Sequence, residues 1–66
     1  MCEDCRRLRQ RYAAATDRRE WAKADLIAAM ASRDADAIQA AQAVKAEAVR
    51  EWEDALADLE AHLKTH

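Results

Sequence analysis

The chain contains neither glycine nor proline in its 66 residues. These two residues end helices and form most tight turns, so their absence leaves the sequence without its usual breaks. Alanine, arginine and glutamate, which are good helix formers, supply much of the sequence, and phenylalanine is absent. β-Branched and aromatic residues, which favour strands, are scarce. We therefore expect an all-α fold in one domain that covers residues 1–66.

Apolar residues recur at steps of three and four in both halves of the chain, as the buried face of a helix requires. Between the two stripes lies a segment with serine and aspartate, which favour helix starts. The pattern predicts a helix over residues 4–31, a tip over 32–35 and a second helix over 35–64, capped by Asp34. The first stripe consists of Leu8, Tyr12, Ala15, Ala22, Leu26 and Met30, and the second of Ile38, Ala41, Val44, Ala48, Trp52, Leu56, Leu59 and Leu63.

A chain that doubles back at residues 33–34 brings the two stripes face to face as an antiparallel, coiled-coil-like hairpin. Leu8 then lies opposite Leu59, and Ala15 lies opposite Trp52. Small side chains meet large ones in this register, as interdigitated packing requires. One continuous helix is the alternative, and it would leave both stripes exposed unless it formed an oligomer.

Two features interrupt the regular stripes. Arg19 occupies a position of the first stripe and comes near Trp52, which would allow a cation–π contact. The second stripe advances by steps of four from Val44 to Leu56, and such a stutter predicts a weak local supercoil.

A two-helix hairpin leaves apolar surface that is not covered, and such surface usually has a partner. Trp21 lies beside the first stripe, and Ile27 widens the apolar surface beyond one narrow seam. We expect these two residues to contribute to a protein-binding surface, with Trp21 as its anchor. Homodimerisation into a four-helix bundle is an alternative use of the same surplus surface.

The only two cysteines and the only two histidines stand at opposite ends of the sequence. Cys2 and Cys5 form C-x-x-C, His62 and His66 form H-x-x-x-H, and a hairpin brings the two pairs together. Two thiolates and two imidazoles are a standard tetrahedral set for structural Zn²⁺. The spacing resembles the ligand pattern of Cys₂His₂ zinc fingers, which implies a zinc site at these four residues. The long helices between the pairs depart from that family, so its DNA-reading helix is not implied.

Three other interpretations of Cys2 and Cys5 stay open. The two thiols could form a redox pair, although the βαβ context of thioredoxin-like motifs is missing. They could be plain reduced thiols, or they could join the same motif of a second copy in a shared Cys₄ site. The position of His66 at the end of the chain weakens its case as a ligand, because terminal residues fray.

Arginines crowd the start of the chain, and acidic residues crowd its end. In the hairpin these segments lie side by side, which predicts ion pairs between the helices. The arginines could instead contact phosphates or an acidic protein. A formal net charge of −2 provides no overall attraction to nucleic acid. The arginines are Arg6, Arg7, Arg9 and Arg11, and the acidic residues are Glu51, Glu53, Asp54, Asp58 and Glu60.

Asp34 and Asp36 lie at the expected tip. A long α-hairpin with an acidic tip resembles the coiled-coil arms of the Gre and DksA/TraR families, which implies entry into the secondary channel of RNA polymerase. The two aspartates are two residues apart here, not three as in the DksA/TraR tip, and the four-cysteine finger of those proteins is missing.

No arrangement of residues points to catalysis, since neither a Ser/His/Asp set nor a glycine-rich phosphate loop occurs. No apolar run approaches the roughly 20 residues that span a membrane, and no signal peptide is visible, so we expect a cytoplasmic protein. The residue usage is typical of a high-GC genome, and phages and high-GC bacteria (actinobacteria among them) encode many small modulators. We expect a zinc-stabilised adaptor or inhibitor that binds a protein; a nucleic-acid-associated protein and a purely structural bundle are the rivals.

Overall fold

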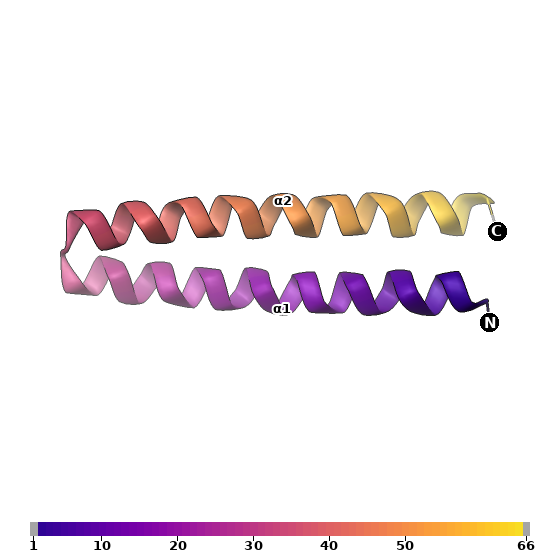
Figure 1. Cartoon of the computed structure of the whole chain (residues 1–66), viewed down its shortest axis with the longest axis horizontal. Coiled ribbons are helices and arrows are strands. Elements are labelled where there is room, and N and C mark those ends of the chain that lie inside the picture. Colours follow the sequence, from indigo (N-terminus) through magenta and orange to yellow (C-terminus); the bar gives the residue numbers. More distant parts are fainter. Residues whose placement is uncertain (1, 66) are drawn as a thin grey trace.

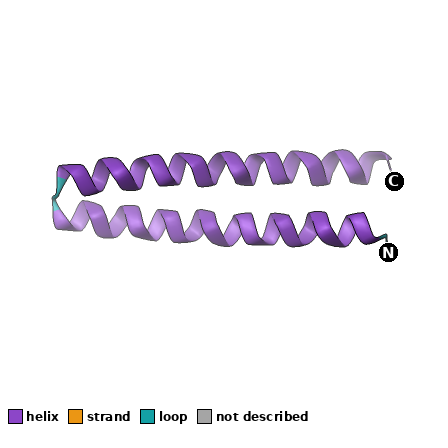
Figure 2. Cartoon of the chain, viewed as in Figure 1, coloured by secondary structure: helices purple, strands orange, loops and turns teal. Residues whose placement is uncertain are grey.

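The computed structural model describes residues 2–65, which form two long helices joined by a tight turn. Helix α1 covers Glu3–Ser32, and helix α2 covers Ala35–Thr65. The helices lie side by side and antiparallel, so that both ends of the chain are at the same end of the rod (Figure 1). Helix and turn account for the described part of the chain (Figure 2). The expected all-α hairpin is confirmed. Helix α1 begins one residue earlier and ends one residue later than predicted, and α2 ends one residue later.

The rod has principal extents of 48 × 14 × 11 Å. Among residues 2–65, neither helix holds a stretch that is both long and apolar enough to cross a bilayer.

One row of residues on each helix faces the other helix, and every member of the two rows is buried or half-buried. Each row alternates steps of three and four along its whole length, which is the strict heptad spacing of a two-helix coiled coil. Facing positions have residue numbers that add up to 67, so Cys5 meets His62 at one end and Ala29 meets Ile38 at the other. The rows are Cys5, Leu8, Tyr12, Ala15, Arg19, Ala22, Leu26 and Ala29 on α1, and Ile38, Ala41, Lys45, Ala48, Trp52, Ala55, Leu59 and His62 on α2.

The predicted register is therefore right, but several predicted stripe residues are wrong. Met30, Val44 and Leu63 are 58%, 52% and 48% exposed, and they lie outside the facing rows. Leu56 is half-buried at the flank of the seam, while Ala55 is buried in it. The seam positions next to these four residues belong to Ala29, Lys45, His62 and Ala55.

The predicted stutter is also wrong, because the row through Lys45 and Ala55 keeps its alternation of three and four. The prediction favoured large apolar residues over smaller or polar neighbours. Close helix approach instead favours alanine, and a lysine stem can lie along an apolar surface while its ammonium group reaches water.

The core is thin. Its buried members are Cys5, Ala15, Ala22, Ala48 and Ala55, and no large side chain of the described residues is fully buried. Alanine faces a larger residue in most layers of the seam, so the helices approach closely while the larger side chains remain half-buried. A core of this kind excludes less apolar surface from water than leucine against leucine would.

Trp52 organises the middle of the seam. The Arg19 guanidinium carbon lies 4.2 Å from the centroid of its ring, which confirms the predicted cation–π contact. The indole Nε1 donates a hydrogen bond of 3.0 Å to the Thr16 hydroxyl, which in turn donates to the Tyr12 carbonyl at 2.9 Å. The Tyr12 and Trp52 ring centroids are 5.8 Å apart. A shift of one turn between the helices would break the three contacts of Trp52 with α1 together.

The turn reverses the chain without glycine. Arg33 takes a left-handed conformation with φ 59° and ψ 22°, and its backbone N–H donates to the Met30 carbonyl. Asp34 then caps α2, because its Oδ1 accepts hydrogen bonds from the backbone N–H groups of Asp36 and Ala37 at 3.0 and 3.4 Å. The predicted cap is confirmed, and capping accounts for one of the two acidic residues at the tip.

Arg33 holds the left-handed conformation that helix ends usually assign to glycine. We predict that Arg33→Gly raises the free energy of unfolding by about 0.5–1 kcal/mol, because glycine adopts positive φ without a steric penalty. Chemical denaturation followed by circular dichroism measures the change. Ala31→Gly, in an exposed helical position two residues earlier, should lower stability by about 1 kcal/mol. A loss of stability in both variants would contradict this account of the turn.

Candidate metal centre

Three of the four predicted ligands lie together at the open end of the hairpin. Cys2 is the residue that caps the start of α1, with extended backbone angles of φ −76° and ψ 155°. Cys5 follows one helical turn later and faces α2 with 4% of its surface exposed. His62 occupies the last position of the α2 row, directly opposite Cys5. The seam register thus brings together residues that are 57 positions apart.

The three side chains form a compact thiol–imidazole cluster, by which we mean Cys2, Cys5 and His62. The Cys2 thiol donates to Cys5 Sγ at 2.8 Å. His62 Nε2 lies 3.0 Å from Cys5 Sγ and 3.2 Å from Cys2 Sγ. The potential ligand atoms all lie within 4.8 Å of one another. His66, the fourth predicted ligand, lies outside the described residues.

Cys2 has a second role that the spacing of the cysteines did not predict. Its Sγ accepts a hydrogen bond from the backbone N–H of Cys5 at 3.2 Å, so the sulfur acts as the N-cap of α1. Backbone N–H groups and the helix dipole both favour negative charge at this end of a helix. The signal in the sequence is the place of Cys2 immediately before Glu3 and Asp4, since acidic residues are common in a first turn.

The pKa of the Cys5 thiol is raised above its ordinary value. The largest cause is the side-chain hydrogen bond with Cys2, followed by burial and by the charge of Cys2. The positive charge of Arg9 and a backbone hydrogen bond with Cys2 act in the opposite direction. Without a metal, Cys5 is thus a neutral thiol near neutral pH, and a bound cation would have to displace its proton.

The donor set and its spacing fit a tetrahedral metal ion. Bond lengths of about 2.3 Å to sulfur and about 2.0 Å to nitrogen place two thiolates roughly 3.8 Å apart and sulfur about 3.5 Å from nitrogen. The observed separations of 2.8, 3.0 and 3.2 Å are each within about 1 Å of these values. Small side-chain rotations would therefore open the cluster enough to hold such an ion, and three protein ligands are already in reach.

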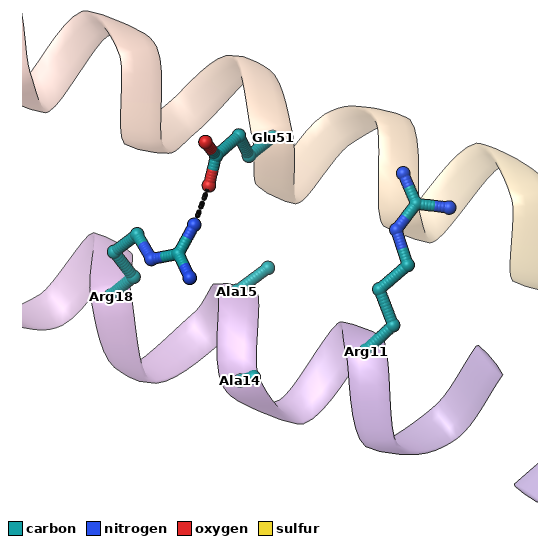
Figure 3. Close-up of a pocket in the computed structure, with 5 residues that line it drawn as sticks. All are labelled: Arg11, Ala14, Ala15, Arg18 and Glu51. Atoms are coloured by element: carbon teal, nitrogen blue, oxygen red, sulfur yellow. Dashed lines mark hydrogen bonds and ion pairs between the residues drawn. The ribbon is translucent and has the colours of Figure 1, made fainter. Parts of the chain in front are cut away.

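The predicted ion pairing between the helices is confirmed for one arginine of the arginine-rich segment, Arg11, and occurs also at Arg18, beyond that segment. Arg11 forms an ion pair with Asp58, and Arg18 forms one with Glu51. Figure 3 shows this side of the hairpin, where Arg11 and Arg18 extend from α1 toward α2 and line a pocket together with Ala14, Ala15 and Glu51. Exposed ion pairs of this kind contribute little to stability, but they favour one alignment of the helices.

The remaining arginines of the segment stay on the surface of α1. Arg6, Arg7 and Arg9 are exposed, and Arg7 pairs with Asp4 of its own helix at 3.2 Å. The structure brings none of these three into the thiol–imidazole cluster, although Arg9 is close enough to influence the pKa of Cys5.

The two apolar residues predicted to bind a partner are both exposed. Trp21 is 72% exposed and Ile27 is 60% exposed. Trp21 lines a shallow depression on the outer side of α1 together with Asp17, Glu20 and Ala24. Both residues lie outside the facing rows, so neither contributes to the seam.

The thiol–imidazole cluster is the one group of three or more potential metal ligands found within residues 2–65. Comparisons of this chain with protein-family models, with curated proteins and with solved structures found no match. The function is therefore argued from the geometry of the cluster and of the surfaces around it.

Proposed function

We propose that the chain is a zinc-clasped helical hairpin that works by binding a protein partner. The observation that supports the clasp is the convergence of Cys2, Cys5 and His62 at the open end, with sulfur and nitrogen atoms 2.8 to 3.2 Å apart. Thiolates and imidazole together favour Zn²⁺ over harder cations such as Mg²⁺ or Ca²⁺. His66 is the proposed fourth ligand, and it would complete a Cys₂His₂ set.

The clasp would act at the end of the hairpin that has no covalent link. The turn at Arg33 and Asp34 joins the helices at one end, whereas noncovalent contacts between described residues hold the other. The thin alanine core leaves the isolated hairpin with little apolar burial, and chains this short usually need a staple. Metal-binding energy would then become folding energy, because the ligands come together only in the folded chain.

The proposed site is structural and not catalytic. Four protein ligands fill the tetrahedral shell of zinc, and no position is left for water or substrate. If the fourth ligand comes instead from a second copy, the site joins two chains and still has no open position. The chain therefore acts as a small adaptor or modulator in this proposal.

The surface around Trp21 is the proposed site for the partner. A tryptophan that is 72% exposed keeps a large apolar surface in contact with water, which is unfavourable. Tryptophan is also among the commonest anchors of protein interfaces. Acidic residues border it at Asp17 and Glu20, and Ala24 leaves the surface beside it flat. This arrangement suits a helix or strand that carries an apolar residue flanked by basic ones.

The metal content of the purified protein tests the clasp. We expect one zinc per chain, and we expect a strong chelator to lower the melting temperature by about 10 °C or more, because a ligand that binds only the folded state stabilises it. Elemental analysis and thermal melting followed by circular dichroism measure the two effects.

Variants of the proposed ligands sharpen this test. Cys5→Ser and His62→Ala should abolish stoichiometric zinc, whereas Thr65→Ala, at a residue that bonds only to backbone carbonyls of its own helix, should retain it. His66→Ala should weaken binding without moving the other ligands. Wild-type protein with no metal and unchanged melting in chelator would refute the clasp, and one zinc per two chains would assign it to a shared Cys₄ site.

Metal affinity should rise steeply with pH. Zinc or cobalt must displace the protons of both thiols, so the dissociation constant should fall by about 100-fold for each pH unit between about pH 6.5 and about pH 8. The metal-free hairpin should behave in the opposite way. Because folding raises the pKa of the Cys5 thiol, this neutral thiol stabilises the fold fully below the ordinary thiol pKa of 9.0. That stabilisation is lost as the pH rises through the higher pKa of the folded state. Cobalt absorption titrations and denaturation of the metal-free protein measure the two slopes.

Trp21→Ala should abolish capture of the protein partner while changing hairpin stability by less than about 0.5 kcal/mol, since the side chain lies outside the seam. Pull-down with immobilised wild type and variant, analysed by mass spectrometry, identifies proteins that depend on Trp21. Lys23→Ala, which removes an exposed side chain two residues away, is the control. Binding to DNA or RNA that falls steeply with salt and depends on Arg6, Arg7 and Arg9 would favour the nucleic-acid function instead.

A further inference from the structure

The two broad sides of the rod differ in chemistry. In each helix, the residue directly after a small seam position, mostly alanine, lies on one side of the seam. The residue directly before a larger seam position lies on the other side. The second side carries the ion pairs of Arg11 with Asp58 and of Arg18 with Glu51. The first side, which we call the apolar face, carries Met30, Val49, Leu56 and Leu63 together with Thr16, Gln42, Arg9 and Lys23, so two of its eight positions are charged.

The apolar face has no complete cover within the hairpin. Met30 and Leu63 are 58% and 48% exposed, and Val49 and Leu56 are only half-buried. Val49, Leu56 and Leu63 recur every seven residues along α2, so they form a continuous ridge beside the seam. Ile27 adjoins Met30 one turn earlier in α1 and extends the face toward the tip.

The larger residues of the seam lie beside the apolar face and add to it. The larger positions of a heptad lie next to the flank that forms the apolar face, while the alanine positions lie next to the ion-paired flank. Because each large residue meets an alanine across most of the seam, its side chain is not fully covered and stays half-buried. The half-buried apolar residues at these larger positions are Tyr12, Leu26, Ile38, Trp52 and Leu59, and Arg19 and Lys45 occupy two further positions of the same kind.

The area that the hairpin leaves in water is large for its mass. Its accessible surface is 5085 Å². A compact monomer of 7.5 kDa would expose about 4200 Å² by the usual scaling of area with mass. The excess of roughly 800–900 Å² is close to the area of about 800 Å² that each partner buries in a standard interface.

We propose that the apolar face binds the same face of a second copy, so that two hairpins form a four-helix bundle. The apolar pattern of α2 supports this arrangement, because seam residues plus one flanking position are typical of bundle helices, whereas a two-helix coiled coil needs the seam alone. A second copy also covers the face along its whole length, since it has the same 48 Å extent. The apolar residues at the larger seam positions become the core of the bundle.

This assembly is independent of the metal clasp and leaves the Trp21 surface accessible. Trp21 lies on the outer side of α1, on the far side of that helix from Thr16. The dimer would therefore present two copies of the partner-binding surface, one on each hairpin.

Mass measurements on the metal-loaded protein test the proposal. Sedimentation equilibrium over a range of concentrations should give twice the chain mass of 7.5 kDa. Leu56→Glu and Met30→Glu should each raise the dimer dissociation constant at least about 100-fold, because the new carboxylate is placed in the interface in both copies. Val44→Glu is the matched control, since Val44 is 52% exposed on the ion-paired side. This variant should remain dimeric.

Circular dichroism of the same samples separates loss of assembly from loss of fold. Met30→Glu changes a side chain that is already 58% exposed, so its hairpin should keep the helicity of the wild type. A wild-type monomer at all concentrations would overturn the proposal, and so would a dimer that Val44→Glu dissociates as strongly as Met30→Glu.

Discussion

The contact of alanine with a larger side chain across the α1–α2 seam is the interaction on which this structure depends. Ala15 meets Trp52, and Ala48 meets Arg19, in consecutive layers at the middle of the rod. Small residues let the backbones approach, and the larger partners then fill the space between turns. Trp52 adds hydrogen bonding to Thr16 and a cation–π contact with Arg19, which favour one register over a slip by a turn. All longer-range features of the hairpin follow from this register.

The thiol–imidazole cluster is the clearest consequence of the seam. Cys5 and His62 are simply its final layer, so the spacing that pairs Ala15 with Trp52 also pairs the sulfur with the imidazole. Cys2 joins them because it caps α1 and its sulfur points back toward the first turn. A metal at this place would stabilise the end of the hairpin that the turn does not close. The same alanines that allow the close approach also leave a thin core, which is why such a clasp would matter to folding.

The seam also divides the surface into sides with different chemistry. Charged residues that precede the larger seam positions form ion pairs between the helices on one side, as Arg18 does with Glu51. Apolar residues on the other side are exposed or half-buried, and Leu56 and Leu63 form part of a ridge there. Trp21 belongs to neither row and faces outward. The proposed self-association, partner binding and metal binding therefore fall on separate parts of one small molecule.

The sequence by itself determined the fold class, the place of the turn and the pairing of the ends. Helix propensity, the aspartate cap at Asp34 and the recurrence of apolar residues are local properties, and together they predicted an antiparallel hairpin in the right register. That register was enough to predict that Cys5 and His62 lie close together. The fourth ligand, His66, lies outside the described residues and stays a prediction.

Only the tertiary structure decided which residues fill the seam. Hydrophobicity alone ranked Val44 and Leu56 above Lys45 and Ala55, yet the smaller or longer-stemmed residues occupy the facing row. Whether these residues fit in the seam depends on the distance between the two helices, and that distance is not a property of either helix alone. The role of the Cys2 sulfur as a helix cap was decided in the same way, because it depends on the direction of one side chain relative to the first turn of α1.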